Sequence, residues 1–179
     1  MRLDGKVAVI TGAARGIGFG IARRFVAAGG RVVIADLDAV TAEASARTLG
    51  ASDVAIGLAM DVTSESAVLG GIEAALSKFG RIDTLVSNAG IQIVHPIEKF
   101  PIADWRRLLA IHLDGAFLTT KAVLPHMYAR GSGSIIYMGS VHSMEASPLK
   151  SAYVTAKHGL LGLARVVSKE GAAHGVRAN

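Results

Sequence analysis

The stretch "TGAARGIG", residues 11–18, constrains the fold most strongly because it directly follows the apolar run "KVAVI". Glycines at positions 12, 16 and 18 permit a tight turn, a close backbone approach and the packing of a helix near the strand. The first turn of that helix would offer free N–H groups and a partial positive charge to a pyrophosphate. A strand, a glycine turn and a helix in this order therefore predict a dinucleotide site. Its candidate residues are Thr11, Gly12, Arg15, Gly16, Ile17 and Gly18.

Strand-like and helix-like segments alternate along the rest of the chain. Short, nearly continuous apolar runs predict strands at 6–11, 31–36, 54–60, 82–87 and 133–139. Amphipathic patterns with start residues and stop glycines predict helices at 16–29, 39–49, 64–79, 101–129 and 151–173. This alternation predicts one α/β domain over residues 1–179: a doubly wound parallel sheet of the Rossmann type in a three-layer αβα arrangement.

The last residues, "HGVRAN", resemble the start of another buried strand, and no turn follows them. A strand needs its full length and a successor to complete a sheet. We therefore expect a C-terminally incomplete domain that lacks its final strands.

Composition excludes several classes of protein. The chain has no cysteine, so disulfides and thiolate metal sites are impossible, which fits a reducing cytosol. The net charge is +5, but the basic residues are scattered singly or in pairs, which does not favour nucleic-acid binding. Charged residues interrupt every apolar run before the roughly 18 residues that a membrane span needs. We therefore expect a cytoplasmic protein with no metal, no membrane and no nucleic-acid partner.

Asp36 ends the run "RVVIAD", about twenty residues after the glycine turn. A carboxylate at this place can accept hydrogen bonds from both hydroxyls of an adenosine ribose, and it would repel a 2′-phosphate. Asp36 therefore favours NAD over NADP. Arg15 indicates the opposite, because an arginine in the turn could approach such a phosphate. Asp36 could instead cap the helix that begins near Asp38.

Two further loops follow predicted strands, at the edge where an open α/β sheet binds its ligand. In "MDV", Asp61 could accept a hydrogen bond from an adenine amino group while Val62 packs against the ring. In "SNAG", Asn88, Ala89 and Gly90 would form a floor along the cofactor. Each is an ordinary loop by itself, but together they predict one groove.

Tyr153 and Lys157 stand four residues apart in "YVTAK", within a predicted helix. Residues at this spacing share a helix face, so the phenol and the ammonium can lie side by side. A nearby cation stabilises the phenolate, which allows a tyrosine to take a proton from an alcohol near neutral pH. Ser140, at the end of the fifth predicted strand, could donate to the same oxygen. The spacing also arises by chance, so this hypothesis depends on the other motifs.

Together these motifs resemble the short-chain dehydrogenase/reductase family over the whole chain. The matching features are the glycine turn, the "NAG" of residues 88–90, a serine before the tyrosine and the tyrosine–lysine pair. The resemblance implies an NAD-dependent oxidoreductase in which Tyr153 is the general acid and base and contacts both cofactor and substrate. It further implies that Lys157 binds the nicotinamide ribose and that Ser140 orients the substrate oxygen.

Three segments resemble the (R)-3-hydroxybutyrate dehydrogenases within that family: "NAGIQIVHPIEKFP", "GSVHSMEASPLKSAYVTAKHG" and "GAAHGVRAN". This resemblance implies that Gln92, His142 and Lys150 bind the carboxylate of a small hydroxy or keto acid. An amide, an imidazole and an ammonium supply several donors and a net positive charge for such an anion. Taken alone, His142 or Lys150 is better interpreted as a solvated loop residue.

The chain departs from the family pattern in two ways. The family usually carries a catalytic asparagine in the pattern "NLxG", whereas this chain has "HLDG" with His112 at that place. A histidine could hold the water that links the lysine to solvent, so His112 is a candidate catalytic residue whose charge is open. The family's chain also continues past the position of Asn179 into a proline–glycine turn, a mobile substrate lid and a last strand, which this sequence lacks.

The helices predicted at 101–129 and 151–173 are apolar most of the way round. One face must cover the sheet, and a second apolar face usually has a second partner. We therefore expect a homo-oligomer, a dimer or a tetramer, that associates through these helices. The alternative is that a segment outside this sequence covers the second face.

Other functions stay open at the level of sequence. A related dehydrogenase could act on another hydroxy acid, a sugar or a steroid. A 3-oxoacyl reductase would normally carry a basic residue where Asp36 and Leu37 stand. The alternative of a different class is a non-catalytic dinucleotide-binding fragment, favoured by His112 and by the missing C-terminal part.

Overall fold

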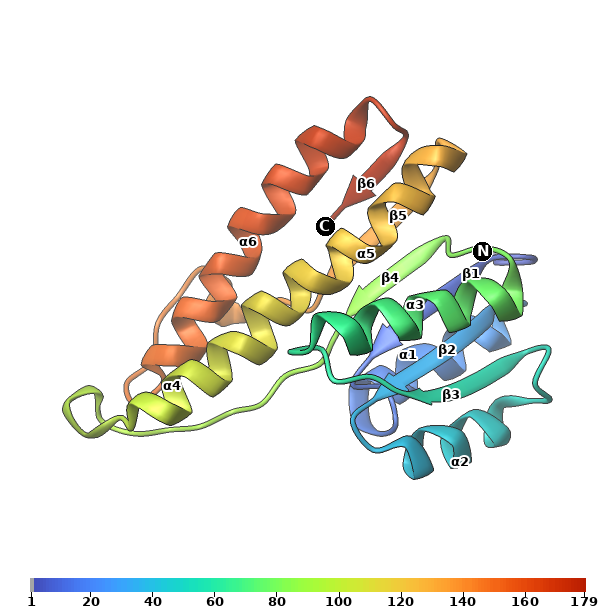
Figure 1. The fold of residues 1–179 in the computed structure, drawn as a ribbon. Coiled ribbons are helices and arrows are strands. Elements are labelled where there is room, and N and C mark those ends of the chain that lie inside the picture. The colour runs from blue at the N-terminus through green and yellow to red at the C-terminus, as the bar shows by residue number, and fades with distance from the viewer. Residues whose placement is uncertain (1) are drawn as a thin grey trace.

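The computed structural model describes residues 2–179 and contains one parallel sheet of six strands (Figure 1). The strands are β1 Val7–Thr11, β2 Arg31–Asp36, β3 Ala55–Ala59, β4 Thr84–Ser87, β5 Gly133–Tyr137 and β6 Val176–Ala178. Their order in the sheet is β3-β2-β1-β4-β5-β6, so the direction of winding reverses between β1 and β4. Every neighbouring pair is parallel. This confirms the predicted doubly wound sheet.

Helices cover both faces of the sheet. They are α1 Gly16–Ala27, α2 Ala39–Leu49, α3 Glu65–Phe79, α4 Ile102–Leu109, α5 Gly115–Arg130 and α6 Ser151–Ala172. Side chains of α1 and α2 pack with Ile10 on one face, and those of α3, α5 and α6 pack with Val9 and Ile135 on the other. The helices cover the first face unevenly. Ile136 of β5 points to this face, and its side chain remains 38% exposed.

The helix predicted at 101–129 consists of three consecutive segments. Helix α4 ends at Leu109, a π-helical segment covers Ala110–Asp114, and α5 begins at Gly115. A π-helical turn contains more residues than an α-helical turn, which rotates the side chains at that point. The segment places His112 on the inner side, where it is buried.

By length and composition, Ile102–Arg130 is the one helical run within residues 2–179 that could cross a membrane. Asp114 and Lys121 interrupt the apolar residues of this run, as expected from the sequence. The run is apolar because it is a core element: Leu108, Val123 and Met127 are fully buried in the hydrophobic clusters of the domain.

The other predicted boundaries agree with the structure to within two residues. The strand predicted at 82–87 begins at Thr84, and the strand predicted at 133–139 ends at Tyr137. Two short 3-10 turns, Ile97–Lys99 and Val141–Ser143, were not predicted. The segment "HGVRAN" does contain a strand, since Ala178 of β6 pairs with Ile135 of β5.

A buried carboxylate fastens the amino end of the sheet. Asp83, just before β4, accepts hydrogen bonds from Val7 N–H at 3.0 Å, from Arg81 at 2.6 and 2.8 Å and from Arg130 at 2.7 Å. Lys6 Nζ lies 3.3 Å away. Burial alone would raise the pKa of Asp83, but the hydrogen bonds from Arg81, Val7 and Arg130 outweigh it and hold that pKa at about 2.

Candidate active site

The turn between β1 and α1 needs glycine for two different reasons. Gly12 and Gly16 have φ angles of 60° and 61°, in the left-handed region that favours glycine. A Cβ on Gly12 would lie 2.8 Å from Ala89 Cα, and one on Gly18 would lie 2.7 Å from Asn88 Nδ2. A Cβ on Gly16 would meet no atom within 4 Å. Gly12 and Gly18 therefore pack against the loop after β4, whereas Gly16 faces open space.

The start of α1 can accept an anion. Its N-cap residue, Arg15, makes no side-chain capping hydrogen bond, and the first turn of the helix holds no acidic residue. The first N–H groups of a helix have no acceptor within the helix, and the helix dipole adds a partial positive charge there. Together with the open space at Gly16, this end of α1 fits a pyrophosphate.

Thr11 and Asn88 fix the turn through hydrogen bonds between the turn and the loop after β4. Thr11 is buried, and its Oγ1 accepts hydrogen bonds from the N–H groups of Asn88 at 3.0 Å and Ala89 at 3.1 Å. The Asn88 amide donates in return to the carbonyl oxygens of Thr11 at 2.9 Å and Gly12 at 3.0 Å. Thr11 was predicted as a cofactor-binding residue, but this burial gives it a supporting role.

A groove of about 380 Å³ runs from the turn along the carboxyl ends of the strands. It brings together eight residues predicted from the sequence, namely Gly12, Arg15, Asp36, Asp61, Val62, Asn88, Ala89 and Gly90. Sequence reasoning missed Leu37, Met60, Ile91, Arg107 and Ile111, which also line it. The first three adjoin predicted residues in the chain, a proximity that could have identified them. Arg107 and Ile111 reach the groove only because α4 and the π segment pack beside it.

Asp36 faces this groove and does not cap a helix. One of its carboxylate oxygens accepts from Ala14 N–H at 2.9 Å and the other from Asp38 N–H at 3.3 Å. Helix α2 is capped by Asp38, whose side chain accepts from Thr41 N–H at 3.0 Å. The alternative interpretation of Asp36 is therefore wrong. Arg15 lies 3.8 Å from the Asp38 carboxylate, so part of its charge is already paired.

Asp61 presents one free carboxylate oxygen to the groove. Its Oδ1 accepts from the N–H of Thr63 at 2.9 Å and from the Thr63 hydroxyl at 2.7 Å. These two bonds fix the side chain and leave Oδ2 available as an acceptor. The arrangement suits the predicted contact with an amino group, and Val62 beside it supplies an apolar wall.

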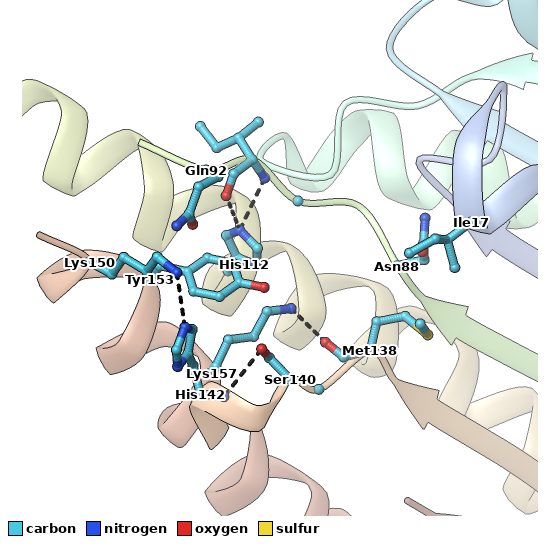
Figure 2. A pocket seen from close by; sticks show the side chains of 13 residues that line it. Ile17, Asn88, Gln92, His112, Met138, Ser140, His142, Lys150, Tyr153 and Lys157 are labelled. Atoms are coloured by element: carbon cyan, nitrogen blue, oxygen red, sulfur yellow. Dashed lines mark hydrogen bonds between the residues drawn. The ribbon is translucent and has the colours of Figure 1, made fainter. Parts of the chain in front are cut away.

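A second cavity, of about 460 Å³, adjoins the groove and holds the proton-handling residues (Figure 2). It brings together all seven residues predicted for catalysis and substrate binding: Gln92, His112, Ser140, His142, Lys150, Tyr153 and Lys157. Asn88, Gly90 and Ile91 line both the groove and this cavity, which makes the two continuous, and Ile17 of α1 lines the cavity as well. The sequence did not identify Met138, whose carbonyl oxygen accepts a hydrogen bond from Lys157.

Tyr153 is surrounded by two imidazoles and an ammonium. The rings of His112 and His142 meet its ring edge-on, with centroids 5.5 and 5.9 Å away. Lys157 Nζ lies 5.4 Å from the Tyr153 ring centroid and donates a hydrogen bond to the carbonyl oxygen of Met138. Burial lowers the pKa of Lys157, because the charged ammonium has left water.

Ser140 begins the short 3-10 turn after β5. Its Oγ accepts a hydrogen bond from His142 N–H at 3.2 Å, and its own N–H donates to Ser143 Oγ at 3.2 Å. This reciprocal pair fixes the Ser140 side chain while its hydroxyl hydrogen stays free to donate. Sequence reasoning does not identify Ser143 as a supporting residue, because the capping pair depends on the turn that forms there.

His112 fastens the loop after β4. Its Nε2 lies 2.8 Å from the carbonyl oxygen of Ile91 and 3.1 Å from Ile91 N, and a Cβ on Gly90 would lie 2.4 Å from its ring. One ring nitrogen cannot donate and accept at once, and the shorter contact favours the tautomer that donates from Nε2. Burial lowers the pKa of His112, and Lys157 adds to that effect against an opposing contribution from Ile91. The imidazole is therefore neutral near pH 7.

Lys150 and His142 form a pair on the other side of Tyr153. Lys150 Nζ lies 3.2 Å from His142 Nε2, and His142 is buried (Figure 2). His142 Nδ1 is buried too and has no hydrogen-bond partner among residues 2–179. Gln92 lines the same cavity from the loop after β4 and is exposed at its mouth.

Comparison with known proteins identifies relatives of the whole chain. Residues 6–179 match the family model described as short chain dehydrogenase. A D-threitol dehydrogenase of Mycolicibacterium smegmatis is 41% identical over 99% of this chain and 69% of its own length. A D-beta-hydroxybutyrate dehydrogenase of Rhizobium meliloti is 40% identical over 97% of this chain and 69% of its own length.

A solved structure gives the same result. The crystal structure of a gluconate 5-dehydrogenase from Burkholderia cenocepacia, in complex with NADP and tartrate, superposes with a TM-score of 0.94. The two chains are 38% identical, and the match covers 99% of this chain and 70% of the other. At this identity and coverage, the similarity extends to the whole described fold.

Proposed function

This chain belongs to the short-chain dehydrogenase family, and we propose that it is an NAD-dependent dehydrogenase that interconverts (R)-3-hydroxybutyrate and acetoacetate. The observation that carries the proposal is the pairing of Lys150 with His142, 3.2 Å apart, beside the ring of Tyr153. With the Gln92 amide, these groups supply donors and net positive charge for a carboxylate. A small hydroxy acid carries its hydroxyl and carboxylate only a few bonds apart, as this arrangement requires.

The residues around the reacting oxygen have separate tasks. Tyr153 takes the proton of the substrate hydroxyl, and Ser140 donates a hydrogen bond to the same oxygen. Lys157 stabilises the phenolate through its charge. NAD, held by the Gly12–Gly18 turn, Asp36 and Asp61, would supply the hydride acceptor for the carbinol carbon. In the reverse direction Tyr153 returns the proton to the oxygen of the keto acid.

NAD is the proposed cofactor because of Asp36. The turn at Gly12–Gly18 would hold the pyrophosphate, Asp36 the adenosine ribose and Asp61 the adenine amino group. A 2′-phosphate would meet the Asp36 carboxylate, and the opposing charge of Arg15 is partly paired with Asp38. Because the similar gluconate 5-dehydrogenase was crystallised with NADP, a direct comparison of NAD⁺ with NADP⁺ tests this preference.

A polyol dehydrogenase is the second candidate, favoured by the similarity to the D-threitol dehydrogenase. Identities of 41% and 40% do not separate the two functions. The chemistry of the cavity favours the acid, because threitol is uncharged and would leave the ammonium of Lys150 without an anionic partner.

The test is a turnover assay that follows the absorbance of the reduced cofactor. NAD⁺ or NADP⁺ is combined with (R)-3-hydroxybutyrate, (S)-3-hydroxybutyrate, D-threitol or gluconate. We expect (R)-3-hydroxybutyrate with NAD⁺ to exceed every other pair by about tenfold or more in kcat/KM. Faster oxidation of D-threitol would favour the polyol reaction. Binding of NAD⁺ without turnover of any alcohol would favour the non-catalytic alternative.

A variant of Lys150 tests the carboxylate site separately. Lys150→Ala should raise KM for (R)-3-hydroxybutyrate by about tenfold or more while KM for NAD⁺ changes by less than about twofold, because only the acid contacts this ammonium. Lys169→Ala, at an exposed lysine of α6, is the matched control. Equal effects of Lys150→Ala on both KM values would contradict the assignment.

We further propose that the chain forms a homo-oligomer, a dimer or a tetramer, through α5 and α6. Phe117 of α5 and Val166 of α6 are 52% and 53% exposed and line one apolar groove with Leu124, Tyr128 and Leu163. Exposed apolar surface of this kind supports association, since water would otherwise cover it.

A further inference from the structure

Leu149, which directly precedes the cavity residue Lys150, has an unusual backbone conformation. It is the one non-glycine residue within residues 2–179 with a positive φ, 68°. Leucine resists this left-handed conformation because its Cβ crowds the following carbonyl oxygen. Its side chain is 51% exposed, so burial of the side chain does not offset that cost. Such strain persists only where surrounding structure enforces it, and it is concentrated at functional sites.

The surrounding structure that enforces it is a hydrogen bond between two loops. The carbonyl oxygen of Leu149 accepts from His95 N–H at 3.0 Å. His95 belongs to the loop after β4, and Leu149 belongs to the loop between β5 and α6. The left-handed turn is thus held by a contact with a segment more than fifty residues away in the chain.

The same two loops supply side chains that line the reacting cavity. Gln92 stands three residues before His95 in the first loop, and Lys150 directly follows Leu149 in the second. Both Gln92 and Lys150 line the cavity, and Lys150 Nζ lies 3.2 Å from His142 Nε2. The backbone direction at Leu149 therefore sets where the Lys150 side chain starts and how far Gln92 stands from it.

We propose that Leu149 is a positioning residue: its left-handed backbone joins the two loops through His95 and turns Lys150 into the cavity. The inference rests on the proposed function, because it assigns Lys150 to the substrate's carboxylate. It predicts that substitutions act according to their tolerance of a positive φ and not according to size or hydrophobicity.

A matched pair of variants separates backbone from side chain. Asparagine is similar to leucine in size, polar and tolerant of the left-handed region, whereas isoleucine is an apolar isomer of leucine that resists it. We expect Leu149→Asn and Leu149→Gly to keep KM for (R)-3-hydroxybutyrate within about twofold of the parent. Leu149→Ile should raise that KM by about fivefold or more, with kcat and the Kd for NADH changed by less than about twofold.

The donor side of the contact has its own matched pair. His95→Pro removes the N–H that Leu149 accepts, and His95→Ala removes the imidazole but keeps the N–H. His95→Pro should raise KM as Leu149→Ile does, and His95→Ala should not. An equal rise for Leu149→Asn and Leu149→Ile, or no rise for Leu149→Ile and His95→Pro, would overturn the proposal.

Amide hydrogen exchange tests the contact without any substrate. Exchange at residues 91–95, followed by mass spectrometry, should be faster in Leu149→Ile and unchanged in Leu149→Asn. Unchanged exchange in Leu149→Ile would contradict the inference. If the parent oxidises a different alcohol, the proposed substrate is wrong, and the KM comparison is made with that alcohol while the exchange result still decides the role of Leu149.

Discussion

Lys157 keeps a charge in a place where charge is costly. It is 5% exposed, and within residues 2–179 its hydrogen bond goes to the carbonyl oxygen of Met138 and not to a carboxylate. Burial accordingly lowers its pKa. Removing a poorly compensated buried charge often stabilises a protein, so we interpret this ammonium as a group retained for chemistry at the expense of stability.

Lys157→Met should therefore separate activity from stability. We expect kcat to fall by about 100-fold or more, because the phenolate of Tyr153 loses its cation. The free energy of unfolding should rise by about 1 kcal/mol, because the apolar side chain no longer has to lose hydration of a charge. Turnover assays and urea unfolding measure the two effects, with Lys169→Met on the exposed face of α6 as the control. A less stable variant with normal turnover would contradict this interpretation.

His112 gives the fold a pH dependence of known sign. Burial lowers the pKa of this histidine from 6.5. As pH falls below about 6.5, the unfolded chain therefore binds more protons here than the folded one. The stability that neutral His112 contributes is complete above about pH 6.5 and is lost as pH falls through the lowered folded pKa. Urea unfolding at about pH 7.5 and about pH 5.5 should show a smaller loss in His112→Asn than in the parent.

The matched control for that comparison is His126→Asn, because His126 is exposed on α5. It should lose as much stability as the parent over the same interval. If His112→Asn also loses as much as the parent, burial does not hold this histidine neutral.

Most residues of the site could be predicted from the sequence, because each motif specifies the positions of its own residues. All seven residues expected in the reacting cavity line it. Arg107 and Ile111 could not be predicted, since they contact the groove through packing of a distant helix. The supporting hydrogen bonds of the Thr11 side chain could not be predicted, because a sequence does not show whether a polar residue faces the ligand or supports the loop that does.

The turn between β1 and α1 shows how one element uses glycine in two ways. Gly12→Ala should lower stability by about 2 kcal/mol or more, since its Cβ would lie 2.8 Å from Ala89 Cα in addition to the strained φ. Gly16→Ala should lower the free energy of unfolding by about 1 kcal/mol because of its strained φ, but its Cβ would meet no atom within the protein. Yet Gly16→Ala should strongly weaken the binding of NADH, because the methyl group would enter the space assigned to pyrophosphate.

Thermal unfolding and NADH titration measure these two effects on the same pair of variants. The control is Gly20→Ala within α1, where a Cβ meets no atom within 4 Å and φ is not positive. This control should be neutral or slightly stabilising, because alanine favours helix. Equal NADH affinity in Gly16→Ala and Gly20→Ala would place the pyrophosphate elsewhere.

The interrupted helix was the element that sequence patterns predicted least well. Residues 101–129 have a helical pattern without a break, so they predict one helix. Within the π segment Ala110–Asp114, His112 contacts Ile91 in a loop some twenty residues away. Such an irregularity depends on tertiary contacts and not on local propensity. The strands were predicted well because burial on both faces imposes a local apolar pattern.

For the molecule as a whole, the Asp83 cluster predicts behaviour in acid. The pKa of Asp83 is lowered from 3.8 to about 2, so the stability it contributes is present above about pH 4 and is lost as pH falls toward 2. That contribution amounts to about 2 kcal/mol. Asp83→Asn should unfold at lower urea concentration near pH 7 and show a flatter loss in acid, measured by circular dichroism. Asp4→Asn, at an exposed aspartate, is the control; superimposable curves for both variants would contradict the assignment.

The apolar face of α5 and α6 predicts the state of assembly. Phe117→Glu introduces a charge at the centre of the proposed contact and should convert the oligomer to a monomer, because a buried unpaired charge is costly. Light scattering after size exclusion measures the mass. Val40→Glu, at a 77% exposed residue of α2, should leave the mass unchanged. A monomeric parent would contradict the proposed association.

The hydrogen bonds between Thr11 and Asn88 also bear on how the chain acquires its cofactor while it is being made. The glycine turn is complete as a sequence by residue 18, but the Asn88 amide that fixes it lies 77 residues after Thr11. On the ribosome, the turn emerges long before Asn88 and β4, and long-range parallel pairing is slow to form. A nascent chain therefore cannot form the complete dinucleotide site until Asn88 and β4 have been synthesised. We expect cofactor binding to follow the joining of β1 to β4, as a late step that stabilises an assembled sheet and does not guide its formation.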